Sequence, residues 1–101
     1  MNTSLTGSDK KFYLVCYDIV QNRRRTRVMK LLKGYGFHVQ KSVFECYLDA
    51  SQLQKLLRRL KKEIDGETDS IRIYAMTLQA VRQVQIIGTG EVNQMTELFV
   101  L

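Results

Sequence analysis

The order of extended and helical patterns along the chain is the feature that most constrains its fold. Residues 12–19 form an almost unbroken apolar run that is too short for a buried helix, which predicts a buried strand. The later segments are predicted to be helical over 22–34 and 51–66, and extended over 37–48 (one long strand or two short ones), 71–76 and 84–87. With two strands in 37–48, this is the order of a split βαβ unit. Right-handed crossovers would place both helices on one face of a mostly antiparallel sheet, so we expect an α+β fold of the ferredoxin-like βαββαβ type.

Short motifs predict where the two helices begin and end. Asn22 is predicted to cap the first helix, and Gly36 is predicted to stop it in a left-handed conformation. Ser51 and Gln54 have the spacing of a capping box at the start of the second helix. Gly66 is predicted to close that helix.

The composition is that of one globular domain. The 101 residues are 45% hydrophobic and 26% charged, which excludes a disordered or low-complexity chain. Residues 1–10 are predicted to form a flexible arm, and residues 11–101 a single ferredoxin-like domain whose apolar end, 97–101, forms a tail strand. No apolar stretch approaches the roughly 18 residues that a membrane span needs. The polar start lacks the apolar core of a signal peptide, so a cytoplasmic location is expected.

The first predicted strand is apolar on both of its faces. Its alternate side chains are Phe12, Leu14 and Cys16 on one face, and Tyr13, Val15 and Tyr17 on the other. Two helices can cover only one face of a sheet, so something else must cover the second face. A second copy of the chain is the simplest candidate.

Positive charge is concentrated in the first part of the chain. The formal net charge is +6, and residues 9–41 hold nine of the sixteen basic residues but two of the ten acidic ones. A single basic helix face is most often a solvated surface, but two such faces with few acids favour contacts with nucleic-acid phosphates. The candidate nucleic-acid-binding residues are Arg23, Arg24, Arg25, Arg27, Lys30, Lys33, Lys55, Arg58, Arg59 and Lys62.

Asp18 is the only acid in the first apolar run, and it lies where that run gives way to a basic loop. A carboxylate in this place can hold a divalent metal through oxygen. It can equally accept backbone hydrogen bonds in a turn, or pair with a nearby Arg. One carboxylate makes a poor magnesium site, but a twofold axis beside the strand end would bring two copies of Asp18 to one ion.

Other residue types give little support for catalysis. His38 is the only histidine, so Ser-His-Asp and Cys-His relays are not favoured. Cys16 and Cys46 each lie inside an apolar run without a second ligand at metal-binding spacing. They are predicted to be small buried hydrophobic residues rather than zinc ligands or a disulfide.

Three stretches together resemble a known family. They are Tyr17-Asp18-Ile19, an Arg-rich loop into a helix that closes at Tyr35-Gly36, and Val-Gln-Lys-Ser-Val-Phe-Glu-Cys over 39–46. Over about residues 11–90 the chain resembles the small CRISPR-associated proteins of family two (Cas2). The resemblance implies a homodimer in which Asp18 of each subunit binds Mg²⁺, and a metal-dependent endonuclease acting on RNA or DNA. It also implies a structural role, in which the dimer bridges dimers of the CRISPR integrase Cas1 and holds the DNA that becomes a new spacer.

Two classes of function therefore stay open. In the enzyme, two Asp18 carboxylates would hold Mg²⁺, Arg25 or Arg27 would grip phosphate, and Tyr17 and Phe44 would shape the site. In the scaffold, the basic helices would bind duplex DNA, while the apolar tail would add a strand to the integrase or to the protein's own dimer. A toxin-like ribonuclease on the same fold is a third alternative. The tail residues are Leu98, Phe99, Val100 and Leu101.

Overall fold

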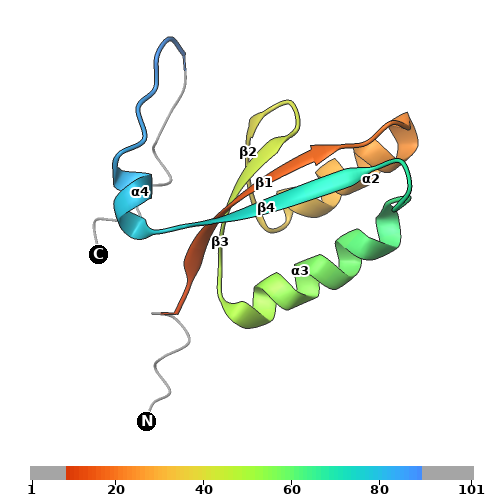
Figure 1. Ribbon diagram of the computed structural model, residues 1–101, viewed down its shortest axis with the longest axis horizontal. Coiled ribbons are helices and arrows are strands. Elements are labelled where there is room, and N and C mark those ends of the chain that lie inside the picture. The colour runs from red at the N-terminus through yellow and green to blue at the C-terminus, as the bar shows by residue number, and fades with distance from the viewer. Residues whose placement is uncertain (1–8, 90–101) are drawn as a thin grey trace.

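The computed structural model describes residues 9–89 (Figure 1). This part of the chain forms the strands β1 (Lys11–Asp18), β2 (Gly36–Gln40), β3 (Val43–Leu48) and β4 (Ser70–Met76), and the helices α2 (Asn22–Lys33), α3 (Ala50–Glu63) and α4 (Leu78–Arg82). The segment 37–48 is thus two strands, joined by a short turn.

The four strands form one antiparallel sheet in the order β2-β3-β1-β4. β1 is central, with Val15 opposite Phe44 of β3 on one side and opposite Ile73 of β4 on the other. This order, with α2 and α3 as the crossovers, is the ferredoxin-like arrangement that the sequence predicts. The α+β prediction is therefore confirmed.

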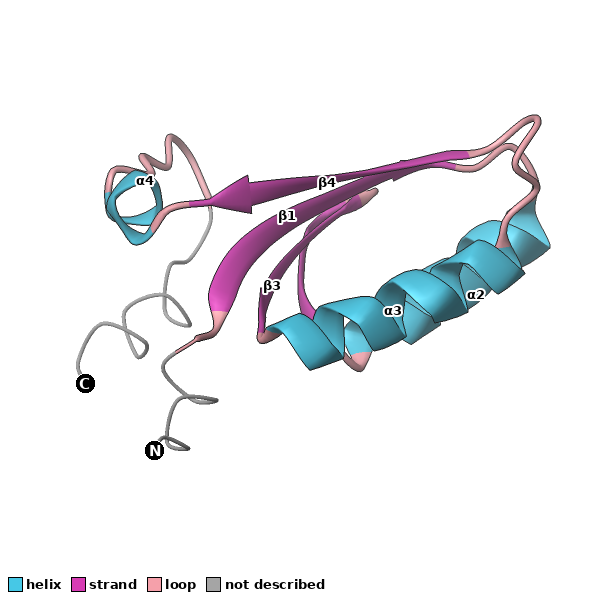
Figure 2. Cartoon of the chain, turned by 60° about the horizontal axis from the view of Figure 1, so that its bottom comes forward, coloured by secondary structure: helices cyan, strands magenta, loops and turns pink. Residues whose placement is uncertain are grey.

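Helices α2 and α3 lie side by side against one face of the sheet (Figure 2). The core lies between this layer and the sheet, because the strands direct alternate apolar side chains toward the helices. Its buried members are Val15, Tyr17, Ile19, Val28, Leu32, Phe44, Cys46, Leu48, Leu56 and Leu60. Cys46 is therefore a buried apolar residue, as expected, and burial raises the pKa of its thiol to about 11.

The caps of both helices differ from the predicted ones by one or two residues. Gln21 caps α2, where its side-chain oxygen accepts a hydrogen bond from the backbone N–H of Arg24. Asp49 caps α3 and forms a reciprocal capping box with Gln52. The Asp49 carboxylate accepts a hydrogen bond from the backbone N–H of Gln52 at 2.8 Å, and Asp49 thus takes the capping role that the spacing predicted for Ser51.

The two glycines predicted to stop the helices have other roles. α2 already ends at Gly34, and Gly36 is the first residue of β2 with an ordinary negative φ. A Cβ at Gly36 would lie 2.4 Å from the Glu45 carbonyl oxygen and 2.6 Å from the Cys46 Sγ. Close approach of β2 to β3, rather than a left-handed turn, therefore requires glycine here. α3 ends at Glu63 and its cap is Ile64, two residues before Gly66.

The predicted strand over 84–87 is wrong within the described residues. After β4 the chain forms the short helix α4, whose N-cap is Thr77, and residues 84–87 then have no regular structure. Val81 of α4 is buried against Phe12, whereas Ile86 and Ile87 remain exposed. A strand needs a neighbour to pair with, and residues 84–87 pair with no described strand.

Some sequence predictions fall outside the described residues. These are the arm over 1–8 and the tail strand over 97–101, including its apolar residues. The division into an arm and a single domain over 11–101 stays a prediction. In the part described, no helix has the length and apolarity needed to cross a membrane.

Candidate functional site

One face of the sheet is left open by α2 and α3. Cross-strand partners project from the same face of a sheet, so the register assigns side chains to this open face. They are Phe12, Leu14, Cys16 and Asp18 of β1, Phe37 of β2, Val43, Glu45 and Tyr47 of β3, and Ser70, Arg72, Tyr74 and Met76 of β4. α4 covers only the Phe12 end, where Val81 contacts Phe12, and no other described element covers this face (Figure 2).

Asp18 lies at the uncovered end of this face. It is the last residue of β1, opposite Ser70 of β4, and its side chain is exposed. Its carboxylate makes no hydrogen bond or ion pair with any residue in the range 9–89. Within this part of the chain, Asp18 therefore neither accepts backbone hydrogen bonds in a turn nor pairs with a neighbouring Arg.

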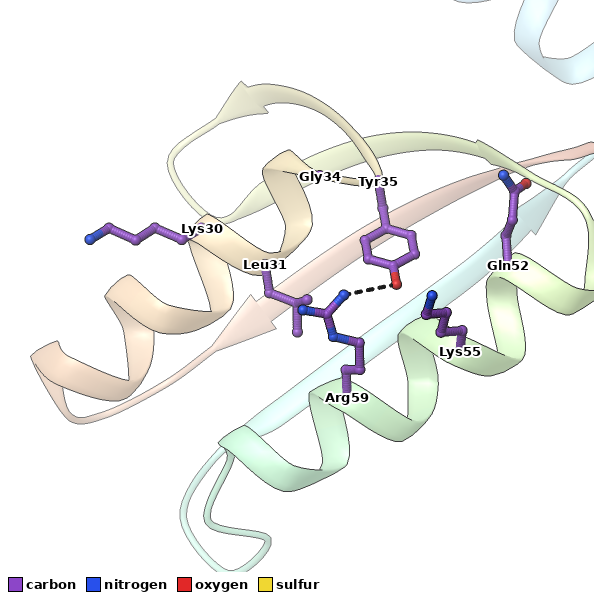
Figure 3. Close-up of a pocket in the computed structure, with 7 residues that line it drawn as sticks. All are labelled: Lys30, Leu31, Gly34, Tyr35, Gln52, Lys55 and Arg59. Atoms are coloured by element: carbon purple, nitrogen blue, oxygen red, sulfur yellow. Dashed lines mark hydrogen bonds between the residues drawn. The ribbon is translucent and has the colours of Figure 1, made fainter.

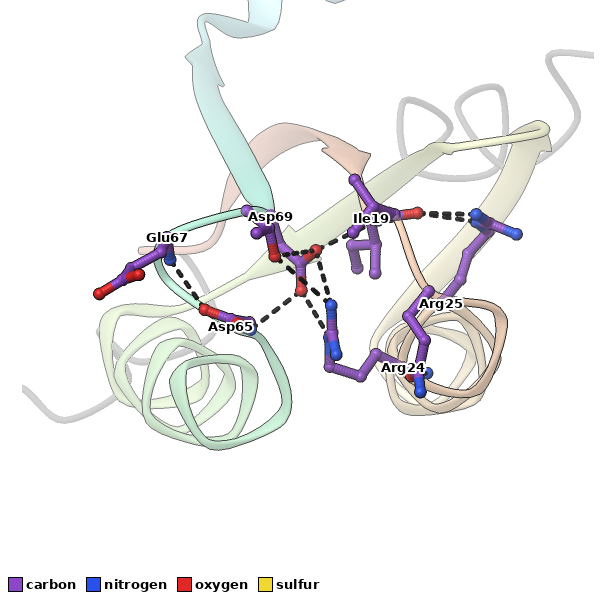
Figure 4. A network of polar contacts seen from close by, with 9 residues as sticks. Ile19, Arg24, Arg25, Asp65, Glu67 and Asp69 are labelled. Carbon is purple, nitrogen blue, oxygen red and sulfur yellow. Dashed lines mark hydrogen bonds and ion pairs between the residues drawn. The ribbon is translucent and has the colours of Figure 1, made fainter.

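The turn role is performed by a different acid, Asp69. Its carboxylate has no exposed surface and lies 2.8 Å from Nε of Arg24. It also accepts hydrogen bonds from the backbone N–H of Val20 at 3.1 Å and of Asp65 at 2.9 Å (Figure 4). The Arg24 guanidinium and these amides hold the pKa of Asp69 well below its usual range. This network ties the loop after Asp18 to the turn before β4.

The basic loop is only partly free for a ligand. Arg24 is held by Asp69, and Arg25 donates two hydrogen bonds to the carbonyl of Ile19 at 3.0 and 2.8 Å and one to the Asn22 side chain. Both arginines therefore stabilise the loop, and their role as phosphate ligands stays a prediction. Arg27 is exposed, and no described residue pairs with it.

The structure does not bring Tyr17 and Phe44 to Asp18. Both side chains are buried on the helix-covered face, with ring centroids 6.4 Å apart. The Tyr17 hydroxyl donates to the Lys41 carbonyl at 3.3 Å, and the Phe44 ring stacks on His38 at 4.5 Å. Successive strand residues point to opposite faces, so Tyr17 supports the core beneath Asp18 and does not line its face.

The remaining candidate cations lie on exposed parts of α2 and α3. No acid in the described residues pairs with these cations. They are Arg23, Arg27, Lys30, Lys33, Lys55, Arg58 and Lys62. Arg59 is more restrained: it donates to the Tyr35 hydroxyl at 3.2 Å and lies over that ring at 5.8 Å. Lys30, Lys55 and Arg59 border a shallow groove of about 400 Å³ between the two helices, and no acid lines it (Figure 3).

A magnesium ion would find one suitable ligand per chain. Asp18 offers an exposed carboxylate of the kind that Mg²⁺ prefers. Within residues 9–89, however, no three His, Cys, Asp or Glu side chains gather at ligand distance. One carboxylate alone is too few ligands for an all-protein site, so Mg²⁺ binding at Asp18 stays a prediction that needs a second copy of the chain.

Sequence reasoning missed the Asp69–Arg24 pair and the Arg59–Tyr35 contact. Asp69 appeared only as part of an acidic turn, and nothing in the spacing of residues 24 and 69 marks them as neighbours. The usable signal was a long arginine three residues beyond the N-cap of a helix, because such a side chain reaches back over the strand ends.

An open, largely apolar sheet face with an exposed carboxylate at its end, and two helices with unpaired cations on the other side of the sheet, characterise this small ferredoxin-like chain. The sequence profile described as CRISPR associated protein Cas2 matches residues 11–84. The chain therefore belongs to the CRISPR-associated Cas2 family.

Two curated relatives are similar over most of both chains. CRISPR-associated endoribonuclease Cas2 3 of Chloroflexus aurantiacus is 49% identical over 81 residues, which are 80% of this chain and 87% of the relative. CRISPR-associated endonuclease Cas2 2 of Thermus thermophilus is 42% identical over 92 residues, covering 91% and 98%.

Solved structures agree in fold. Streptococcus pyogenes Cas2 has a TM-score of 0.70 and 36% identity, covering 76% of this chain and 99% of that chain. A chain of a partial Cas6-RT-Cas1–Cas2 complex has a TM-score of 0.68 and 27% identity, covering 76% and 84%.

Proposed function

We propose that two copies of this protein associate through their open faces and cleave phosphodiester bonds of RNA or DNA with the help of Mg²⁺. The observation that carries this proposal is Asp18, an exposed carboxylate without a partner in the described residues, at the end of an uncovered apolar face. The names of the two relatives, an endoribonuclease and an endonuclease, support the reaction class and leave the nucleic acid open.

Each residue near the proposed site would have a separate role. Asp18 of each copy would hold the ion from opposite sides of a twofold axis. When bound, Mg²⁺ would supply a Lewis acid that neutralises charge on the phosphate and lowers the pKa of a bound water. Arg27, with which no described residue pairs, would grip a neighbouring phosphate, while Asp69 and Arg24 hold the loop that follows Asp18.

The test is metal-dependent cleavage by the purified protein. Labelled RNA and DNA are incubated with the wild type, Asp18→Asn and the control Glu67→Gln, which removes a charge from an exposed turn. We expect cleavage only with a divalent cation, and a loss of at least about 100-fold in Asp18→Asn with no change in the control. Cleavage that survives both chelator and Asp18→Asn contradicts the proposal.

A second candidate function is that of a DNA-binding adaptation subunit without catalysis. Two observations favour it: the unpaired cations on α2 and α3, and the similarity to a chain from a complex that contains Cas1. In this role the basic helices would contact duplex DNA, and the tail Leu98–Leu101, outside the described residues, stays the predicted integrase contact. Spacer capture in cells that is intact in Asp18→Asn but lost when Arg58 and Lys62 become Ala would favour the scaffold.

A further inference from the structure

Glu45 is a half-buried carboxylate in the middle of the open face. It lies opposite Leu14 of β1 on one side and Phe37 of β2 on the other. Within the described chain its carboxylate has no hydrogen bond or ion pair. Burial against these apolar neighbours raises the pKa of Glu45. This acid is therefore already partly desolvated before anything covers the face.

Covering the face would leave Glu45 in an unfavourable environment unless a cation joined it. A carboxylate buried without a partner is strongly destabilising, whereas one with a well-placed arginine is tolerated. The second layer of the proposed dimer would therefore be favoured if it brought a positive charge to Glu45, because otherwise Glu45 would have to take up a proton on assembly.

Arg72 is the cation of the open face that is available for this. It is exposed on β4, opposite Cys16 of β1, and its guanidinium contacts the Tyr74 hydroxyl at 3.4 Å but no described acid. Lys10, another cation near this face, lies over the Tyr47 ring at 5.8 Å. Tyr47 packs with Phe12 at the end that α4 covers.

Glu45 and Arg72 of one chain are separated by β1. β3 and β4 lie on either side of that strand, so the two residues are two strand spacings apart, each about 4.8 Å, and the structure records no ion pair between them. Consider a twofold axis that lies between two facing sheets and runs parallel to β1. Rotation about it exchanges the β3 side of one sheet with the β4 side of the other. It would place β4 of one copy over β3 of the other.

The same axis satisfies the requirement of the metal site. Asp18 belongs to β1, so an axis along this strand brings the two Asp18 side chains together. In this arrangement the partner's Arg72 is offset from Glu45 by one pleat repeat of about 6.6 Å along the strand. A long arginine side chain can span that offset between packed sheets.

We propose that Glu45 of each copy forms an ion pair with Arg72 of the partner subunit, so that two symmetric pairs flank β1 and fix how the two sheets lie on one another. The inference rests on the dimer of the proposed function and deepens it by naming the contact that sets its geometry. The apolar side chains drive association of the sheets, and the two pairs disfavour shifted arrangements, in which a buried carboxylate would lack its cation.

A charge-exchange experiment tests the pairing. The dimer dissociation constant is measured by sedimentation for the wild type, Glu45→Arg, Arg72→Glu and the double variant, with Lys10→Glu as a control of equal charge change. We expect each single reversal to weaken the dimer about tenfold or more, the double variant to recover to within about threefold of the wild type, and the control to change little.

The outcomes separate the two proposals. A wild type that stays monomeric overturns the dimer itself. A wild-type dimer that tolerates the single reversals, or that the double reversal does not restore, overturns the pairing alone. If circular dichroism shows that a charge reversal prevents folding, the neutral variants Glu45→Gln and Arg72→Gln replace it. If the two residues are paired, the double neutral variant weakens the dimer no more than either single variant does.

Discussion

At the scale of single residues, one acid that the charge pattern does not single out forms several hydrogen bonds within residues 9–89. Asp69 is buried, paired with Arg24, and bonded to the backbone N–H groups of Val20 and Asp65. Asp18, by contrast, is exposed, and its carboxylate has no hydrogen bond or ion pair in the described chain. The two acids thus divide two roles between them: Asp69 stabilises the strand ends, and Asp18 is left available for a ligand.

The lowered pKa of Asp69 predicts how the stability of the fold depends on pH. A carboxyl whose folded pKa lies below its unfolded value of about 3.9 stabilises the fold above that value and loses this contribution as the pH falls toward the folded pKa. Asp69→Asn should therefore lower the melting temperature by several degrees at neutral pH and flatten its fall below about pH 4. Thermal melts across pH measure this, and Asp9→Asn should keep the wild-type profile.

At the scale of elements, the β2–β3 contact leaves no room for a side chain at Gly36. The Glu45 carbonyl and the Cys46 sulfur would both lie within 2.6 Å of a Cβ at that position. Since Glu45 also projects onto the open face, the packing of this hairpin affects both layers of the molecule.

Two glycine substitutions give a matched test of this contact. Gly36→Ala should destabilise the protein by roughly 1–3 kcal/mol, because the strands must move apart. Gly66→Ala should be neutral or slightly stabilising, because a Cβ there has no neighbour within 4 Å and reduces the freedom of the unfolded chain. Urea unfolding measures both, and equal effects of the two changes would contradict the close-approach explanation.

The elements also show what sequence can and cannot predict here. A short apolar run correctly predicted the strand around Val15, and extended segments contain those around Phe44 and Ile73. Period-3.6 patterns correctly predicted both long helices, because burial of one helix face imposes that period. The caps at Gln21 and Asp49 were missed because several polar residues near each helix start could serve equally well. Residues 84–87 have a strand composition but no strand, since pairing depends on a neighbour that this part of the chain does not provide.

The candidate site was less predictable than the fold. Asp18 could be singled out because it is an isolated acid in an apolar run. The burial of Tyr17 and Phe44 on the other face follows from strand alternation and could have been deduced. The use of Arg24 and Arg25 as loop supports could not, because it depends on Asp69 and Ile19 lying beside them in space.

At the scale of the whole molecule, the two layers present different surfaces. The outer surfaces of α2 and α3 carry unpaired cations, and the opposite side of the sheet is largely apolar. A dimer that closed the apolar side would therefore keep both basic helix layers on its outside, where nucleic acid could reach them.

This arrangement predicts the salt dependence of nucleic-acid binding. Replacing Lys30 and Lys55, which border the groove between the helices, with Ala should reduce the slope of log affinity against log salt by about 2 for duplex DNA, since each phosphate contact contributes about 0.9. Lys41→Ala, on the turn between β2 and β3, should leave the slope unchanged. Fluorescence anisotropy over a salt series measures it, and a slope that is the same in all variants would place the duplex away from the groove.

The Asp69 network has a consequence for amide hydrogen exchange. The N–H groups of Val20 and Asp65 lie in loops, where exchange with solvent is ordinarily fast, yet both donate to a carboxylate that water does not reach. They should exchange as slowly as amides of the central strand, because their release requires the buried pair to open. The end of the sheet that bears Asp18 is then already ordered in the single chain, so an ion or a second subunit that bound there, as proposed, would incur little conformational entropy cost.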